Sequence, residues 1–261
     1  MFQEEETVLR VKHVSDSKDP YLVPGLMRGL AVLQAFTPLK PELTLTGIAN
    51  ELGITRSAAF RTVHTLVSEG YLLATREGTC YRLGPAVVRL SYGYHASREL
   101  LEVAQPVLAK VRDVHDWSTH LGVLDGRHVL YLMRLPATGG LSSLVHVGSR
   151  LPAATTAMGR VLLSGKPESF LRKLYDDLEP RAVEAILTRA AQDRTTGHVA
   201  GIGSFESGLS SMAAPVLDLT GEVVAAISAT RSTETIPDDI AHALNDAGAR
   251  ISRGLGWRPV A

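Results

Sequence analysis

The side chains best placed to contact another molecule lie on a helix expected over residues 56–69. At about 100° per residue, one arc of this helix is polar and basic, and it carries Ser57, Phe60, Arg61, His64 and Ser68. The opposite arc is mostly apolar and should pack on the preceding helices through Ala59, Thr62, Val63 and Leu66. A helix that enters the major groove of DNA needs small polar side chains and Arg near its N-terminal half. The pattern therefore indicates base readout, although in isolation it would also suit an ordinary surface helix.

A second short helix precedes this one. Thr46 is expected to cap it, Leu52 ends it, and Gly53 supplies a left-handed turn residue. Thr55 then caps the following helix. Two helices joined by a three- or four-residue turn that contains Gly are typical of a helix-turn-helix.

A predicted hairpin completes the unit. Gly70 closes the second helix, and two short apolar runs follow at residues 71–74 and 80–83. The five residues between the runs include Gly78, which suits a hairpin turn. The order helix, turn, helix and hairpin favours a winged helix-turn-helix over an unrelated surface helix.

Charge is uneven along the chain. Lys plus Arg and Asp plus Glu both total 27, so the whole chain is neutral. Residues 24–93 hold seven Lys or Arg against four Asp or Glu, a net of +3, whereas residues 1–23 carry −2 and the remainder −1. A positive excess over the winged helix is what contact with DNA phosphates requires.

Composition limits the class of protein. A chain of 261 residues with 45% apolar and 21% charged content suits two globular domains. The acidic first ten residues are unlike a secretory signal, and no apolar run approaches the length of a membrane span. The single cysteine, Cys80, cannot form an internal disulfide or a Cys-rich zinc site. We expect a cytoplasmic protein with no membrane segment, metal or cofactor.

The domain boundaries follow from these patterns. Residues 1–20 are expected to form a polar or disordered arm, and residues 21–92 a DNA-binding domain with the start of a linker helix. A helix over residues 26–36 should pack on the helix-turn-helix through an apolar side that includes Leu26, Leu30 and Leu33. Residues 97–261 should form a regulatory domain.

The regulatory domain mixes helical and strand periods. Two hairpins are expected, one turning at Asp125 and Gly126 and one at residues 218–221. A further strand is expected over residues 141–147, and helices over residues 97–117, 155–164, 168–174, 181–192 and 237–255. These elements predict an α+β fold, with an antiparallel sheet and helices packed on it.

Three segments carry a family resemblance: TRSAAFRTVHTLVSEGYL, RLPAATTAMGRVLLSG and GLSSMAAPVLDLTGEVVAAISA. Their order and spacing resemble the IclR family of bacterial transcription regulators over residues 24–257. The resemblance implies a winged helix-turn-helix, a linker helix and a C-terminal GAF-like domain that binds a small organic effector. It also implies binding of double-stranded operator DNA by a homodimer or a tetramer (dimer of dimers). The segments look most similar to the branch that regulates aromatic-acid catabolism.

The resemblance also implies particular contact residues. The DNA-binding positions of the family fall on Thr55, Arg56, Ser57, Phe60 and Arg61, with a wing contact at Arg76. The effector-binding positions fall on Ser143, Ala157, Met158, Gly159, Leu209 and Ser211. Backbone N–H groups at a helix N-terminus are a natural seat for a carboxylate. Gly201 and Ser204 stand where relatives have acidic residues, which implies a roomier, less acidic pocket and a bulkier effector, an aromatic carboxylate.

Other functions stay open at this point. Nine histidines could suggest metal or catalytic chemistry, but none forms a His-x-x-x-His pair. Asp116, Ser118 and His120 are close only in sequence, and triads form in space; His146 lies beside the expected pocket. One alternative is a metabolite-processing enzyme on the C-terminal domain. The other is a DNA-binding regulator whose C-terminal domain only oligomerises.

Overall fold

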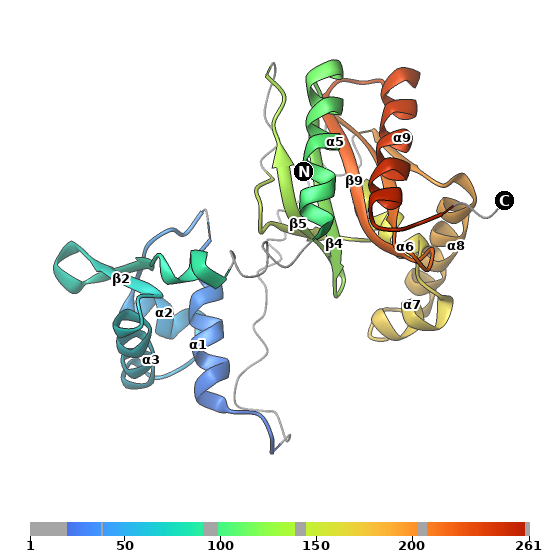
Figure 1. Cartoon of the computed structure of the whole chain (residues 1–261). Coiled ribbons are helices and arrows are strands. Elements are labelled where there is room, and N and C mark those ends of the chain that lie inside the picture. Colours follow the sequence, from blue (N-terminus) through green and yellow to red (C-terminus); the bar gives the residue numbers. More distant parts are fainter. Residues whose placement is uncertain (1–19, 38, 91–98, 139–144, 203–207, 259–261) are drawn as a thin grey trace. The chain divides into compact units, whose positions relative to one another are not determined.

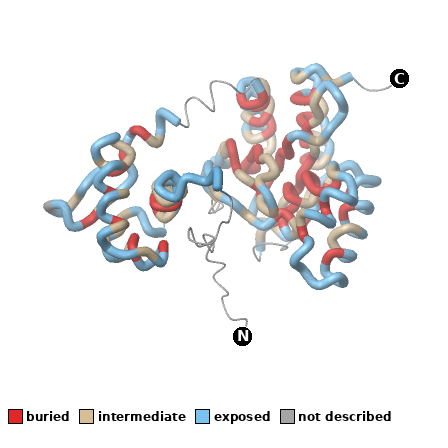
Figure 2. The backbone as a smooth tube through the Cα atoms, turned by 90° about the horizontal axis from the view of Figure 1, so that it is seen from below, coloured by how far each residue is buried: buried red, intermediate tan, exposed pale blue. Residues whose placement is uncertain are grey.

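The computed structural model describes residues 20–37, 39–90, 99–138, 145–202 and 208–258 (Figure 1). The chain divides into two compact units, Met1–Ser97 and Arg98–Ala261, each with its own apolar core. Figure 2 shows that buried residues gather inside each unit, while its outer turns are exposed.

The first unit is a winged helix-turn-helix, as predicted. Its helices are α1 (Pro24–Gln34), α2 (Leu45–Leu52) and α3 (Arg56–Ser68). Its small antiparallel sheet has the order β1-β3-β2 and consists of β1 (Leu43–Thr44), β2 (Leu72–Thr75) and β3 (Cys80–Leu83). The single-turn helix η1 (Arg76–Gly78) lies in the turn of the wing. Residues 86–90, beyond the wing, are helical.

Local signals set the ends of α2 and α3. Gly53 ends α2 at φ 63°, and Thr55 caps α3 by accepting the Ala58 N–H at 3.3 Å, which confirms both predictions. The predicted cap of α2 was wrong, because Thr44 rather than Thr46 accepts the Gly47 N–H, at 3.0 Å. Thr44 pairs with β3 and is therefore extended, as an N-cap residue must be.

The predicted packing of α1 was also wrong in part. Leu26 and Leu30 are 62% and 51% exposed, and the helix instead buries Ala31 and Val32. Both leucines lie more than about 100° around the helix from Val32. The sequence of α1 thus offers two apolar stripes, and only the stripe with Val32 faces the core of this unit.

The second unit is built on a six-stranded sheet with the order β6-β5-β4-β9-β8-β7. Every neighbouring pair is antiparallel, which confirms the predicted α+β fold. The strands are β4 (Ser118–Asp125), β5 (His128–Leu135), β6 (Arg150–Pro152), β7 (Val199–Ile202), β8 (Leu209–Leu217) and β9 (Val223–Ser232). The helices are α5 (Glu99–His115), α6 (Ala157–Ser164), α7 (Glu168–Leu174), α8 (Pro180–Thr196) and α9 (Asp238–Gly254).

Helices cover both faces of this sheet. On one face α5 and α9 lie side by side (Figure 1), and the Thr119 hydroxyl of β4 donates to the Leu108 carbonyl of α5 at 3.2 Å. On the other face α6 packs on the central strands, and α8 packs on α6. Gly159 lets α6 approach closely, since a Cβ at this position would stand 2.2 Å from the Ala153 carbonyl oxygen.

The edges of the sheet differ most from the prediction. β6 and β7 were not predicted, because strands of three and four residues show too little alternation. Of the strand expected over residues 141–147, residues 145–147 are not in a strand and residues 141–144 lie outside the described residues. The predicted helix after the wing runs on into residues 91–94, which are also outside them.

Candidate DNA interface and effector site

The face predicted to contact DNA lies on α3 in the first unit. Buried Ala59 and Val63 anchor this helix in the core. All five α3 positions predicted to contact DNA are exposed: Thr55, Arg56, Ser57, Phe60 and Arg61. The helix therefore presents the predicted face to solvent.

An open groove of about 730 Å³ connects this helix with the wing. It is lined by Thr44, Leu45, Thr46, Arg56, Ser57, Phe60, Arg61, Gly78, Thr79 and Tyr81. Four of the predicted DNA contacts thus share one concave surface with the turn of the wing.

The three arginines predicted to contact DNA differ in their partners. Among the described residues, neither Arg56 nor Arg61 forms an ion pair, so both charges are available to phosphate or base. Arg76 sits in the wing turn at φ 49°, and its Nε lies 3.3 Å from Glu42 Oε2. Its side chain is still 73% exposed, so it can reach outward from this ion pair.

The remaining α3 contacts are held by their neighbours. The hydroxyls of Thr55 and Ser57 lie 3.2 Å apart, while Thr55 also caps the helix. The rings of Phe60 and His64 pack at 5.9 Å between centroids. These contacts fix the side chains of the first two turns, where a recognition helix meets base edges.

In the second unit, strand register gathers polar side chains on one face of the sheet. Residues directly opposite each other in antiparallel strands share a face. His120 of β4 stands opposite Ser228 of β9 and Arg134 of β5, and Thr230 of β9 stands opposite Ser211 of β8. We call this set, with Tyr131, the polar sheet face: His120, Tyr131, Arg134, Ser211, Ser228 and Thr230.

Hydrogen bonds order the polar sheet face. Ser228 Oγ and His120 Nδ1 are 3.3 Å apart, and the Thr230 hydroxyl donates to Ser211 Oγ at 3.3 Å. The Tyr131 ring meets the His120 ring edge-on, with centroids 5.7 Å apart. The polar sheet face therefore contains two hydrogen-bonded pairs, Ser211 with Thr230 and His120 with Ser228.

Burial keeps two members of this face, His120 and Tyr131, neutral. Desolvation, followed by the nearby Arg134 charge, lowers the pKa of His120 to about 4. Burial raises the pKa of Tyr131 to about 12. At neutral pH both side chains can form hydrogen bonds but carry no charge.

Three of the predicted effector contacts lie on or beside this face. Ser211 belongs to it, and Leu209 lies two residues along the same strand. Met158 reaches it from α6, because a Cβ on Gly122, two residues beyond His120, would stand 3.0 Å from Met158 Cε. Gly201, which has no side chain, stands opposite Ser211.

The other predicted effector contacts are more constrained. Ala157 is buried in the apolar core, and the Gly159 N–H donates to Thr156 Oγ1 at 3.2 Å. Of the first turn of α6, the N–H groups of Ala157 and Met158 have no acceptor among the described residues. Ser143 and Ser204 lie outside the described residues.

Sequence reasoning missed His120, Arg134, Ser228 and Thr230. One signal was present: Ser228 and Thr230 alternate with apolar residues in β9, and the hairpin at residues 218–221 places Thr230 opposite Ser211. His146, considered for the pocket, is exposed. Its backbone N–H donates to Ser149 Oγ at 3.0 Å.

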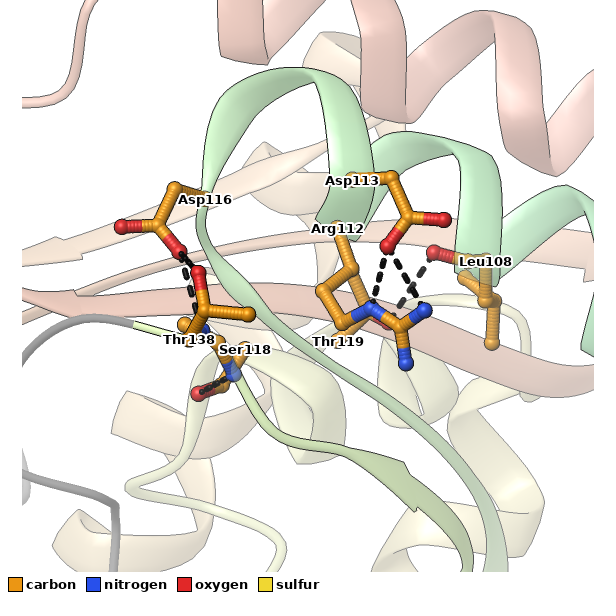
Figure 3. A network of polar contacts seen from close by, with 8 residues as sticks. Leu108, Arg112, Asp113, Asp116, Ser118, Thr119 and Thr138 are labelled. Carbon is orange, nitrogen blue, oxygen red and sulfur yellow. Dashed lines mark hydrogen bonds and ion pairs between the residues drawn. The ribbon is translucent and has the colours of Figure 1, made fainter.

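Asp116, Ser118 and His120 do not form a triad. Figure 3 shows Asp116 turned toward Thr138, whose N–H and hydroxyl donate to its Oδ1 at 2.9 and 2.8 Å. Ser118 Oγ accepts the Ala137 N–H at 3.0 Å. These bonds fasten the residues after β5 to the start of β4, and each side chain serves a different partner.

No helix in the described part of the chain is long and apolar enough to cross a membrane. The same residues contain no group of three or more His, Cys, Asp or Glu side chains arranged for a metal ion.

Comparisons with known proteins agree with this architecture. The family model for the IclR helix-turn-helix domain matches residues 25–75, and the model for the bacterial transcriptional regulator IclR C-terminal domain matches residues 92–253. The Pca regulon regulatory protein of Pseudomonas putida is 36% identical over 80% of this chain and 75% of its own length. The p-hydroxybenzoate hydroxylase transcriptional activator of Acinetobacter baylyi is 30% identical over 82% of this chain and 83% of its own.

A solved structure extends the likeness to three dimensions. An IclR homolog from Microbacterium hydrocarbonoxydans, complexed with 4-hydroxybenzoate, superposes with a TM-score of 0.78 at 27% identity. The match covers 88% of this chain and 98% of that chain. Together with the winged helix and the covered antiparallel sheet, these matches show that the chain belongs to the IclR family of bacterial transcriptional regulators.

Proposed function

We propose that this regulator binds operator DNA through α3 and the wing, and that an aromatic carboxylate bound on the polar sheet face sets its DNA affinity. The observation that carries the proposal is the pairing of two recognition surfaces in one chain: a basic groove in the first unit and a buried polar face in the second. Residues 21–92 then act as the DNA-binding domain and residues 97–261 as the regulatory domain.

The DNA contacts divide by their geometry. Arg61 and Ser57 on the exposed arc of α3 read base edges in the major groove, with Phe60 beside them. Thr55 and Arg56, at the start of the helix, hold the adjacent phosphates. Arg76, in the turn of the wing, contacts phosphate or the minor groove, and its ion pair with Glu42 breaks when it binds DNA.

The effector lies between α6 and the sheet. The N–H groups of Ala157 and Met158 and the Ser211 hydroxyl hold its carboxylate, while Leu209 and the Met158 side chain line its apolar body. Gly201, opposite Ser211, adds no side chain to the site, which suits a ring rather than a two-carbon acid. Three similar proteins support an aromatic acid: the Pca regulon regulator, the hydroxybenzoate hydroxylase activator and the structure with 4-hydroxybenzoate.

The active form is a dimer, or a dimer of dimers. A single α3 with one central Arg reads too few bases to select an operator alone, so two copies on a pseudo-palindrome are needed. The exposed apolar side chains Leu22, Leu26 and Leu30 follow a four-residue spacing along and before α1 and suit contact with a second copy. The chain acts by binding rather than turnover, in the cytoplasm, where bacterial DNA lies.

Reciprocal binding tests this proposal. Fluorescence anisotropy measures the affinity for an operator duplex, recovered from genomic fragments, with and without 4-hydroxybenzoate. The ligand should change operator affinity by about 5- to 150-fold, and operator should change ligand affinity by the same factor. Turnover of the ligand would instead favour a metabolite-processing enzyme. No binding across a broad library of acids would favour a regulatory domain that only oligomerises.

A further inference from the structure

One nitrogen of the polar sheet face has no partner. His120 is 2% exposed, and its Nδ1 lies beside Ser228 Oγ. Its Nε2 is buried and has no hydrogen-bond partner among the described residues. Buried polar atoms in native proteins are nearly always hydrogen-bonded, so an unpaired one at a ligand site calls for a partner from the ligand.

The charges and hydrogen bonds around His120 determine which kind of ligand atom its Nε2 can bind. His120 is neutral at pH 7, because burial and Arg134 lower its pKa to about 4. The Ser228 hydroxyl is its polar neighbour on the other side, and when that hydroxyl donates to Nδ1, the ring proton is on Nε2. Nε2 then needs an oxygen acceptor, which the positive charge of Arg134, directly across on β5, also favours.

The distance between His120 and Ser211, where the carboxylate is proposed to bind, sets the size of the ligand. Ser211 is on β8 and His120 on β4, with β9 between them. The two residues are two strand spacings apart and are also offset by two residues along the strands, because Ser211 pairs with Thr230 and His120 with Ser228, so about 12 Å separates them. One hydrogen bond cannot bridge this distance, but a benzoate ring with an oxygen opposite its carboxylate can, with one hydrogen bond at each end.

We infer that His120 determines effector specificity, its Nε2–H donating to an oxygen substituent on the ring of an aromatic acid whose carboxylate lies at Ser211. This inference rests on the proposed function and deepens it. It predicts that the site selects ring-oxygenated acids over unsubstituted benzoate, since a buried donor is left unpaired when the ring has no oxygen.

A pair of substitutions separates this role from a structural one. In His120→Asn the side-chain amide takes the place of Nδ1, so the contact with Ser228 can persist while the atom at Nε2 is lost. In His120→Gln the amide nitrogen reaches the place of Nε2. His242→Leu on α9 is the matched control, because His242 is exposed and its helix covers the other face of the sheet.

The experiment is calorimetric titration of the full-length protein and the three variants with benzoate and with 4-hydroxybenzoate. The parent and His242→Leu should bind 4-hydroxybenzoate about tenfold or more tightly than benzoate. His120→Asn should lose this preference while it binds benzoate as the parent does. His120→Gln should retain most of the preference.

Two results would overturn the inference, and they are distinguishable. If His120→Asn weakens both ligands equally, or keeps the parental preference, His120 does not contact the ring oxygen, while the aromatic effector stands. If the parent binds neither ligand, the aromatic effector class itself fails, and the inference fails with it. Circular dichroism of each variant shows that a lost preference is measured on a folded protein.

Discussion

Thr230 and Ser211 stand directly opposite each other on β9 and β8, and the Thr230 hydroxyl donates to Ser211 Oγ at 3.3 Å. Because Ser211 Oγ accepts in this bond, its own hydroxyl proton is left to donate to the carboxylate that is proposed to lie there. Ser211→Leu should therefore fill the site and abolish effector binding, while ligand-free operator affinity stays near parental. Calorimetry measures the affinity for the effector, and fluorescence anisotropy measures the affinity for the operator. Parental effector affinity in this variant would place the site elsewhere.

Arg61 provides a test of base readout. Arg61→Ala should weaken binding to the specific operator by about 1–3 kcal/mol, because a bidentate contact with a base is lost. Binding to a duplex of scrambled sequence should change much less at the same salt concentration. Equal losses on both duplexes would mean that Arg61 contacts phosphate only.

Arg76 should act on all sequences alike. Arg76→Ala should weaken specific and scrambled duplexes together and reduce the slope of log affinity against log salt by about one unit. Glu42→Ala is the matched change, because it releases Arg76 from its ion pair and removes a negative charge near the wing. It should strengthen binding. If neither variant alters the slope, the wing does not touch DNA.

His120 should make stability fall in acid. Its pKa in the folded protein is about 4, below the ordinary value of 6.5, so the unfolded chain takes up a proton first as pH falls. This contribution is fully present above pH 6.5 and is lost progressively down to pH 4, with a total of about 3 kcal/mol. Arg134 and Tyr131 face the ring, and burial raises the pKa of Tyr131 to about 12. Urea unfolding between pH 7 and 4.5 should show a smaller decline for His120→Asn, and parallel curves would contradict the assignment.

Gly159 should tolerate no side chain. In Gly159→Ala the new Cβ would stand 2.2 Å from the Ala153 carbonyl oxygen, so α6 must move away from the strand that precedes it. We expect a loss of about 1–3 kcal/mol in the unfolding free energy of the second unit, together with weaker effector binding. Gly29→Ala in α1 is the comparison, since nothing lies within 4 Å of its Cβ position. It should be neutral or stabilising, as Ala is favoured over Gly in helices.

Local patterns allowed much of the fold to be predicted. The ends of α7 agree with the predicted residues 168–174, and β8 and β9 meet at the hairpin turn predicted for residues 218–221, because Pro167 precedes α7 and Gly221 lies in that turn. The outward arc of α3 was predictable for the same reason. Such features depend on residues that are close together in the sequence, so a single sequence is enough to predict them.

What could not be predicted depends on distant neighbours. The partner of His120 is Ser228, 108 residues away, and nothing near either residue in sequence indicates the pairing. The same holds for α1, where the side with Leu26 and Leu30 was predicted to pack, and only the tertiary contacts select the stripe with Val32. A histidine in an apolar strand is most often buried and satisfied, so its unpaired Nε2 becomes visible only when the strands are assembled.

Thr44 has two bonding roles at once: its backbone pairs with Cys80 of the wing, and its side chain caps α2. The wing and the start of α2 are therefore joined through one residue. A phosphate bound at the wing, as proposed above, would act on the N-terminus of α2 through Thr44, and α2 leads through Gly53 to the cap of α3. We therefore expect the wing and α3 to bind DNA in one concerted step, with the angle between the wing and α3 fixed before DNA binds.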